Sequence, residues 1–412
     1  MIVLMAILVI TPLFSRAVHP AVAFFAFILW AIDSINKQGL NFLFGDRYGV
    51  AKWWIILIGW EILLSFIGFS TTEPNTFILR RLPVYLTPLI GLYCIRTYSI
   101  REIRSLFLIL CAIIFINLFL NIGLWLRNPE VFEGISRFEA IESRLNIADT
   151  AFVHDILFLL PLLYILYHSS FIKGKRILFL FVILLSILFI SYINPRATAF
   201  FILILYVFAL FFVRRANKSN LHGITRVLLY AIALGLVVAF AVPVLEWMAS
   251  LLPERMAVRI NDTIESINGG TITNDSEEGS LYVRWMLAQV SLDTWLSGPI
   301  NFIFGKGEDL AASGRIDDLI SLGIGQHSEF VDFLAKYGLF GAFLLYKALH
   351  STFTFILSLC YNDSIKSYVR VTMIGFLVMS TLNNTLIADN VIVVFIMLPS
   401  SIILSQKYLK RT

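Results

Sequence analysis

The chain has 412 residues, of which 58% are hydrophobic and only 14% are charged. Soluble domains contain roughly 45–50% apolar and about 25% charged residues, so this composition excludes an ordinary soluble protein and indicates an integral membrane protein. The formal net charge of +5 arises from loops that alternate in charge along the chain, which excludes a nucleic-acid-binding patch.

Apolar segments recur along nearly the whole chain, and a hydrocarbon core of roughly 30 Å needs about 20 apolar residues per helix. The segments are solidly apolar and lack the period-two alternation of strands, which favours helices. We therefore predict an all-α polytopic membrane protein with about twelve transmembrane helices. They fall near residues 2–14, 20–33, 53–69, 82–95, 105–126, 151–168, 177–193, 197–213, 227–247, 330–358, 371–388 and 391–405.

The charges of the connecting loops predict the topology. Every second loop from residue 96 onward is basic, as in 96–104, 169–176 and 214–226, and the positive-inside rule places these loops and both termini in the cytoplasm. The alternate loops are acidic: residues 127–150 hold five carboxylates against three arginines, and residues 248–329 hold twelve against five basic residues.

Three arginines depart from this scheme, because Arg16, Arg80 and Arg81 fall on the outer side. Either the first four spans are miscounted, or some of these arginines meet an anionic ligand.

The chain divides into three regions on this pattern. Residues 1–247 form transmembrane helices 1–9, residues 248–329 form one large periplasmic loop, and residues 330–412 form helices 10–12 and a cytoplasmic tail. Within the large loop, helices are predicted over 254–267 and 279–295, separated by Gly-, Asn- and Ser-rich breaks.

The cysteines do not suggest a disulfide framework or a metal centre. Cys94, Cys111 and Cys360 lie far apart, in or at the ends of apolar segments, without a CxxC or Cys/His cluster. Such cysteines behave as small apolar residues, and we expect neither a metal nor a cofactor.

The strongest candidate for chemistry is His327, which stands at the boundary between the large loop and an apolar helix. Histidine titrates near 6.5, so it can accept a proton from a hydroxyl nucleophile close to neutral pH. Ser328 follows directly, and Gly338 and Gly341 come later, at positions where missing side chains allow helices to approach closely.

Basic residues of the outer side form a second set of candidates. Arg196 ends a very short turn between two spans, and Arg284 opens the segment that leads to His327. A guanidinium binds phosphate oxygens in a two-pronged fork and keeps its charge, which suits a diphosphate ligand. Further candidates for the same ligand are Arg259, Arg315 and Lys306, the last of these in a Gly-Lys-Gly tripeptide.

Polar residues inside apolar spans are functional candidates by default. His154 and Asp155 sit near the outer end of their segment and are accessory candidates, as is Asp332 in the helix after His327. Glu61 has a simpler interpretation, pairing with another helix. The other intramembrane candidates are Asn117, Asn121, Asn383 and Asn384.

His327 with Ser328, followed after nine residues by Gly338 and then Gly341, resembles the signature of the O-antigen ligase/polymerase family. The resemblance covers roughly residues 190–360. It implies a GT-C-like, metal-independent and inverting glycosyltransferase of the bacterial inner membrane, acting on its periplasmic face. His327 would be the base, and Arg196 and Arg284 would bind the diphosphate of an undecaprenyl-diphosphate-linked glycan donor. Arg259 followed by Gly270 after ten residues is similar to a spacing of periplasmic loops in the polymerases.

Within the family, the string HSEFVDFLAKYG resembles Wzy-type O-antigen polymerases more than WaaL-type ligases, which more often have Asn after the histidine. A polymerase would join lipid-linked repeat units in the bilayer, with a Wzz-type chain-length regulator as a further partner. Two alternatives stay open: a ligase that transfers glycan to lipid A-core, and a polysaccharide or lipid transporter without chemistry.

Overall fold

The computed structural model describes residues 46–67, 81–127, 241–251, 281–307, 321–325, 328–383, 385–386 and 388–409, with scattered positions within 28–36, 158–165 and 257–264. All regular secondary structure in these residues is helical, so the predicted all-α class is confirmed for the part of the chain that the structure describes. The helices are α4 (Val50–Ile67), α6 (Leu82–Thr97), α7 (Ile100–Arg127), α14 (Ala241–Leu251), α16 (Leu281–Leu296), α17 (Pro299–Phe304), α19 (Glu329–Ser358), α20 (Asp363–Leu382), α21 (Ala388–Ile392), η4 (Val393–Met397) and α22 (Leu398–Leu409).

Most of these helices lie where apolar segments predict them. Helices α4, α6, α7 and α19 match four predicted spans to within a few residues, and α16 matches the helix predicted over 279–295. By length and apolar composition, α19 is the one helix among the described residues that qualifies as a membrane span, and 390–406 is a shorter apolar helical run.

The predicted span 371–388 differs from the observed helix. Helix α20 begins at Asp363, because Asn362 accepts a hydrogen bond from the Ile365 N–H at 2.8 Å and caps it. It ends at Leu382, and Asn383 is extended (φ −161°, ψ 166°). Polar side chains such as Asn compete for backbone hydrogen bonds and favour helix ends, so the apolar run is interrupted where the sequence turns polar.

The last predicted span is also composite. Helix α21 continues into the π-helical turn η4 and then into α22. Single π-helical turns inside longer helices frequently occur at functional sites, and this one follows the five-residue helix α21.

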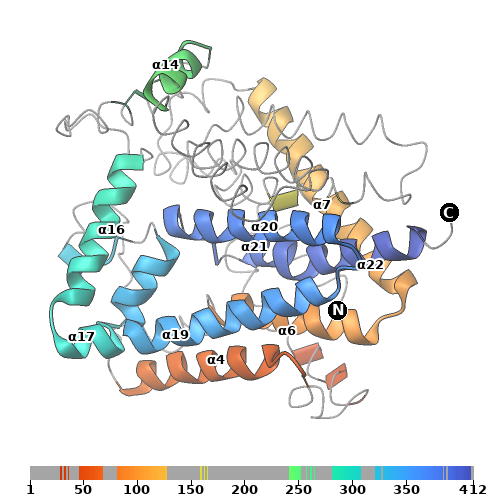
Figure 1. The fold of residues 1–412 in the computed structure, drawn as a ribbon, viewed down its shortest axis with the longest axis horizontal. Helices are drawn as coiled ribbons and strands as arrows, with labels where there is room; N and C mark the ends of the chain where they lie inside the picture. The colour runs from red at the N-terminus through yellow and green to blue at the C-terminus, as the bar shows by residue number, and fades with distance from the viewer. Residues whose placement is uncertain are drawn as a thin grey trace, which may run out of the picture.

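Helices α4 and α19 lie side by side and antiparallel (Figure 1). Tyr48, just before α4, contacts Phe355 near the end of α19, with ring centroids 5.9 Å apart. Further along α4, Trp60 meets Phe340 edge-on at 4.6 Å. Helix α6 packs against α4 on one side and against α21 and η4 on the other, and α20 packs against α19.

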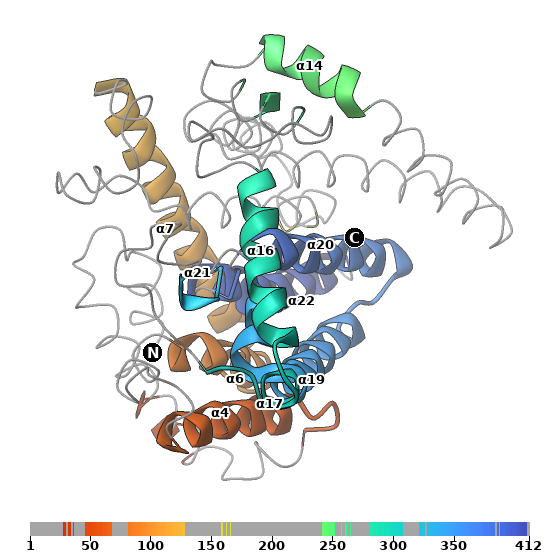
Figure 2. The same cartoon turned by 90° about the vertical axis from the view of Figure 1, so that its left-hand side faces the viewer.

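Helices α16 and α17 stand at one end of this bundle, beside the N-terminal part of α19. Figure 2 views the molecule from that end, with α16 and α17 in front. Helix α14 lies apart from the other labelled helices in both views. The N-terminal part of α19 therefore joins the bundle to the α16–α17 pair.

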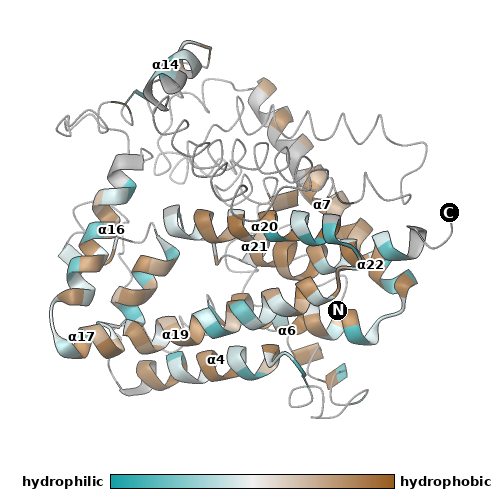
Figure 3. Cartoon of the chain, in the orientation of Figure 1, coloured by the Kyte–Doolittle hydropathy of each residue, from teal (hydrophilic) through white to brown (hydrophobic). Residues whose placement is uncertain are grey.

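Apolar residues recur along the helices of the bundle (Figure 3). On α4, Ile55 and Leu63 are exposed, and on α19 Leu339, Phe340 and Phe343 are exposed. A helix that is apolar on all sides is either deep core or a membrane span.

Helix α19 contains one non-helical residue, Gly338 (φ 65°, ψ −170°), where the helix kinks. This backbone region is essentially restricted to glycine. Residues 306 and 307 donate backbone hydrogen bonds to carbonyls of α19 beside this kink. The Lys306 N–H donates to the Ala335 carbonyl at 2.8 Å, and the Gly307 N–H donates to the Lys336 carbonyl at 2.9 Å. The Gly-Lys-Gly tripeptide thus satisfies two carbonyls that the kink would otherwise leave without partners.

At the same kink, the backbone of α19 is in direct contact with the backbone of residues 303–305. A Cβ on Gly338 would lie 2.3 Å from the Ile303 carbonyl, and a Cβ on Gly305 would lie 2.2 Å from the Lys336 carbonyl oxygen. No side chain fits at either position. Gly338 therefore allows the kink of α19 and its close contact with α17.

One ion pair lies near each end of α6. Arg96 in the last turn of α6 pairs with Asp46 at 2.9 Å, and Asp46 also accepts hydrogen bonds from backbone N–H groups at the start of α4. Arg81, directly before α6, pairs with Glu329, the first residue of α19, at 3.1 Å. The two arginines are separated by about 22 Å along the helix axis at 1.5 Å per residue.

Candidate active site

Six of the predicted site residues lie outside the described residues: His327, Arg196, Arg259, Arg315, His154 and Asp155. The roles predicted for Arg196 and His327 therefore stay predictions. Arg284, Lys306 and Asp332 are described, together with both flanks of His327, residues 321–325 and 328 onward.

A buried hydrogen-bond network holds these two flanks together. Ser291 on α16 donates to Asp332 Oδ1 at 2.6 Å and accepts from the Gly325 N–H at 2.9 Å. Asp332 Oδ2 accepts from the Ser328 N–H at 2.9 Å, and Ser328 Oγ accepts from the Val331 N–H at 3.4 Å, which caps α19. The chain is therefore fixed on α16 and α19 immediately before and after residues 326–327.

This network gives Asp332 a definite role. Its carboxylate is buried, and each of its oxygens accepts a hydrogen bond from a neighbouring segment. An acidic group in the first turn of a helix is also stabilised by the helix dipole. Asp332 was predicted as an accessory residue, and its contacts hold the chain on both sides of residues 326–327 to α16 and α19.

Arg284 lies on the same helix as Ser291, two turns earlier. One turn after Arg284, the Leu287 carbonyl oxygen would be 2.2 Å from a Cβ on Gly325, so α16 and the segment before His327 touch backbone to backbone. Arg284 precedes Leu287 by three residues, which is about 4.5 Å along the helix axis. Residues at this spacing are neighbours on the helix surface. The structure thus brings the turn of Arg284 close to the chain that leads into His327.

Lys306 is anchored in a different way from the one predicted. Its exposed side chain donates from Nζ to the Leu322 carbonyl at 2.6 Å, and its N–H bonds to α19. Lys306 therefore ties the segment before His327 to the kink of α19. Its predicted contact with a diphosphate stays a prediction.

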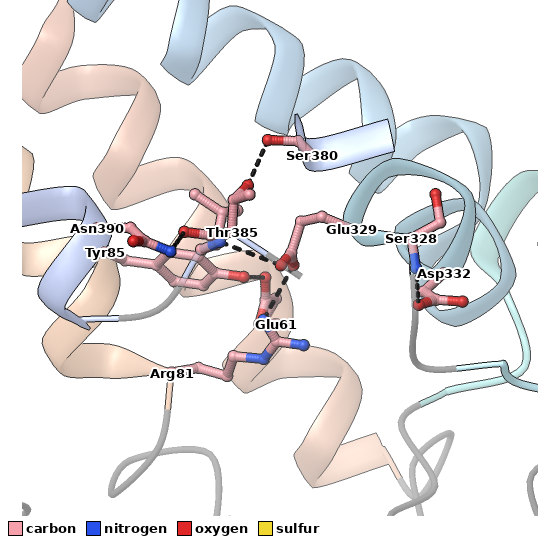
Figure 4. Close-up of polar contacts among 10 residues, drawn as sticks. Glu61, Arg81, Tyr85, Ser328, Glu329, Asp332, Ser380, Thr385 and Asn390 are labelled. Carbon is pink, nitrogen blue, oxygen red and sulfur yellow. Dashed lines mark hydrogen bonds and ion pairs between the residues drawn. The ribbon is translucent and has the colours of Figure 1, made fainter. Parts of the chain in front are cut away.

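A second polar cluster, not predicted from the sequence as a site, lies where α19 begins (Figure 4). Glu329 Oε1 accepts from Arg81 NH1 at 3.1 Å, and Glu329 Oε2 accepts from the Leu386 N–H at 3.2 Å. The Glu329 N–H reaches the Asn383 carbonyl at 3.4 Å. Glu329 thereby joins the start of α19 to α6 and to the break between α20 and α21.

The pairing also explains an arginine that departs from the predicted charge pattern. The anion that Arg81 meets is a carboxylate of the protein, and the side chains of Arg81 and Glu329 are only 17% and 4% exposed. Arg16 and Arg80 lie outside the described residues.

Glu61 completes this cluster from α4. Its Oε1 accepts from the Tyr85 hydroxyl at 2.6 Å, and both side chains are buried. Glu61 was expected to pair with another helix, and Tyr85 on α6 is such a partner. Beside them, Asn390 donates to the Thr385 carbonyl at 3.3 Å (Figure 4).

Within the described parts of the chain, no group of three or more His, Cys, Asp or Glu side chains is arranged to hold a metal ion. Burial raises the pKa of the Cys360 thiol to about 11, so at neutral pH this cysteine is a protonated packing residue.

The chain was compared with known proteins. No protein-family model matches it, and no curated protein is detectably similar in sequence. The resemblance to the O-antigen ligase/polymerase family therefore depends on the residues around His327.

The residues that sequence reasoning missed are Glu329 and Tyr85. Glu329 is the last residue of the predicted loop 248–329, among many other carboxylates of that loop, so its position gave no special signal. Its partner Arg81 is 248 residues away, and no local pattern connects the two.

Proposed function

We propose that the protein is a glycosyltransferase of the bacterial inner membrane that joins lipid-linked oligosaccharide repeat units of an O-antigen or another surface polysaccharide. The frame proposed for it is GT-C-like, with about twelve transmembrane helices and the large loop 248–329 on the periplasmic face. The donor is an undecaprenyl-diphosphate-linked glycan, and the reaction is inverting and needs no metal.

The observation that carries this proposal is the fixed geometry around residues 326–327. Gly325 and Ser328 are held by one buried pair, Ser291 and Asp332. A base must be held in a defined place to accept a proton in the transition state, because misplacement by about 1 Å can cost about 100-fold in rate. The anchored residues Gly325 and Ser328 support this role for His327, which lies between them in the sequence.

In the proposed reaction, a hydroxyl oxygen of the acceptor glycan attacks the anomeric carbon of the donor. The bond between that carbon and the diphosphate oxygen breaks, and the electron pair leaves with undecaprenyl diphosphate. His327 accepts the hydroxyl proton. Arg196 and Arg284 stabilise the charge that develops on the diphosphate, which fixed cations do more effectively in a site that excludes water.

The ion pairs of the bundle support the proposed topology. The alternation of basic loops assigns Asp46 and Arg96 to the cytoplasmic side, and Arg81 and Glu329 to the outer side. Each ion pair joins residues assigned to the same side. A miscount by one span between the partners of a pair would have assigned them to opposite sides. The exposed apolar faces of α4 and α19 also suit contact with lipid.

An assay with purified protein and defined lipid-linked repeat units tests the proposal. A ladder of longer glycans on undecaprenyl diphosphate is the result expected of a polymerase. Transfer only when lipid A-core is added would replace polymerase with ligase. If neither product forms under conditions in which the protein stays folded, the protein is not this transferase, and glycan transport across liposomes becomes the activity to measure.

A further inference from the structure

We infer that the Arg81–Glu329 ion pair is a positioning device for His327, which sets the base relative to the helix bundle. This inference rests on the proposed function, since it concerns the residue proposed as the base. It assigns to Arg81 and Glu329 a role separate from that of the arginines proposed to bind the diphosphate.

The first argument is chain connectivity. Glu329 follows His327 by two residues, and two residues of chain span at most about 7 Å. A change in the position of Glu329 therefore moves His327 with it. Glu329 is also the first residue of α19, so its contacts determine where that helix begins.

The second argument is that the start of α19, directly after His327, has two supports. On the loop side, Ser291 and Asp332 tie it to α16. On the bundle side, Glu329 ties it to Arg81 before α6 and to the Leu386 N–H after α20. Figure 4 shows the Glu329 and Asp332 side chains on different sides of α19.

The third argument concerns the kink at Gly338. Because α19 is interrupted there, its first nine residues are not held in line with the rest of the helix by continuous backbone hydrogen bonds. In the described residues, the Arg81–Glu329 ion pair links this first part of α19 to the start of α6, and the Glu329 N–H bonds to the Asn383 carbonyl after α20. The contacts of Glu329 thus help to set the position of the N-terminal part of α19 in the bundle.

The chemistry of the pair fits this role. Both side chains are largely buried, with 17% of Arg81 and 4% of Glu329 exposed. Charged hydrogen bonds are directional and roughly twice as strong as neutral ones, and removing one partner of a buried pair leaves the other charge uncompensated. Such a pair tolerates little displacement, as a support for a catalytic turn requires.

The test measures steady-state glycan transfer by the full-length purified protein, with four variants: Glu329→Gln, Arg81→Gln, the double variant of both, and Arg81→Lys. We expect each Gln variant to lower kcat about 100-fold, the cost of misplacing a catalytic group by about 1 Å, with KM for the donor changed less than about threefold. Because the two residues act as one unit, the double variant should be no slower than the slower single variant. Arg81→Lys keeps the charge and should recover at least about tenfold over Arg81→Gln.

Arg96→Gln is the matched control, since it breaks the ion pair with Asp46 at the other end of α6, where the side chains are 28% and 1% exposed. A general loss of stability would affect this variant as well. We expect its kcat to stay within about threefold of wild type while thermal unfolding of both classes of variant shifts downward.

The outcomes separate the two proposals. If the wild type makes no product, the proposed function fails. If the wild type is active and the two Gln variants keep kcat within about threefold, the pair does not position the base. The inference is also overturned if the fold losses in kcat of the two single variants multiply in the double variant. An equal loss of kcat in Arg96→Gln overturns it as well. If the Gln variants fail to fold, Arg81→Lys decides: a folded Lys variant that is as inactive as a His327→Ala control contradicts a role based on charge, and a largely active one supports it.

Discussion

Replacement of Gly338 by alanine should destabilise the protein, because this glycine allows both the kink of α19 and its contact with α17. Gly338 has φ 65° and ψ −170°, a conformation that residues with a Cβ rarely adopt. The added Cβ would lie 2.3 Å from the carbonyl carbon and oxygen of Ile303. These are backbone atoms, which cannot rotate away as the end of a long side chain could.

The magnitude follows from two contributions. Strained backbone at such a position costs about 1–3 kcal/mol, and the two backbone hydrogen bonds that Lys306 and Gly307 make to α19 contribute about 0.5–1.5 kcal/mol each. If the segment moves away to relieve the contact, these bonds are lost, and the total loss is about 2–6 kcal/mol.

Thermal unfolding in detergent or nanodiscs measures this effect, with Gly59→Ala as the control. Gly59 is an exposed glycine within α4, and a Cβ there meets no atom within 4 Å. Alanine is favoured over glycine inside a helix by about 0.5–1 kcal/mol, so the control should unfold at the wild-type temperature or slightly above. A Gly338→Ala protein that unfolds at the same temperature as Gly59→Ala would refute the account of the kink.

Four further predictions can be checked separately. Ser291→Ala removes the partner of a buried carboxylate and of a backbone N–H, so we expect a loss of about 1–3 kcal/mol in the free energy of unfolding, read from denaturant curves; an unchanged midpoint would contradict the network. Arg284→Lys keeps the charge but loses the two-pronged fork, so transfer should slow at least about tenfold at saturating acceptor, and wild-type kinetics would remove this residue from the diphosphate site. Cys360 should label slowly with maleimide, because burial raises its pKa to about 11 and its thiolate fraction at pH 7.5 is about 300-fold below that of an ordinary thiol; fast labelling would contradict its burial. Engineered cysteines at positions Asn217 and Ser276 should then label from opposite sides of the membrane, and equal labelling of both from outside would overturn the topology.

Sequence reasoning found the helices that depend on local pattern. The apolar run at 330–358 predicted α19 to within one residue, because the pattern of apolar side chains that a helix buries is local in the sequence. The helix over 281–296 was predicted for similar reasons.

Features that depend on distant contacts could not be predicted. The backbone hydrogen bonds from Lys306 and Gly307 to the kink of α19 have no signal in the local sequence. Helix α20 ends at Leu382 because the polar residue Asn383 follows, and a hydropathy average over a long segment does not resolve this end. The partner of Arg81 follows from how α6 and α19 pack, since Glu329 is 248 residues away.

The central claim is that His327 is the base of a glycosyl transfer reaction, and the most direct measurement compares His327→Ala with the wild type. Both purified proteins receive the same undecaprenyl-diphosphate-linked repeat unit, and product length is followed over time, with unfolding curves recorded for each. The account predicts that the wild type makes longer glycans while the variant, equally folded, makes none. A folded His327→Ala protein that extends the glycan at near the wild-type rate would contradict the account.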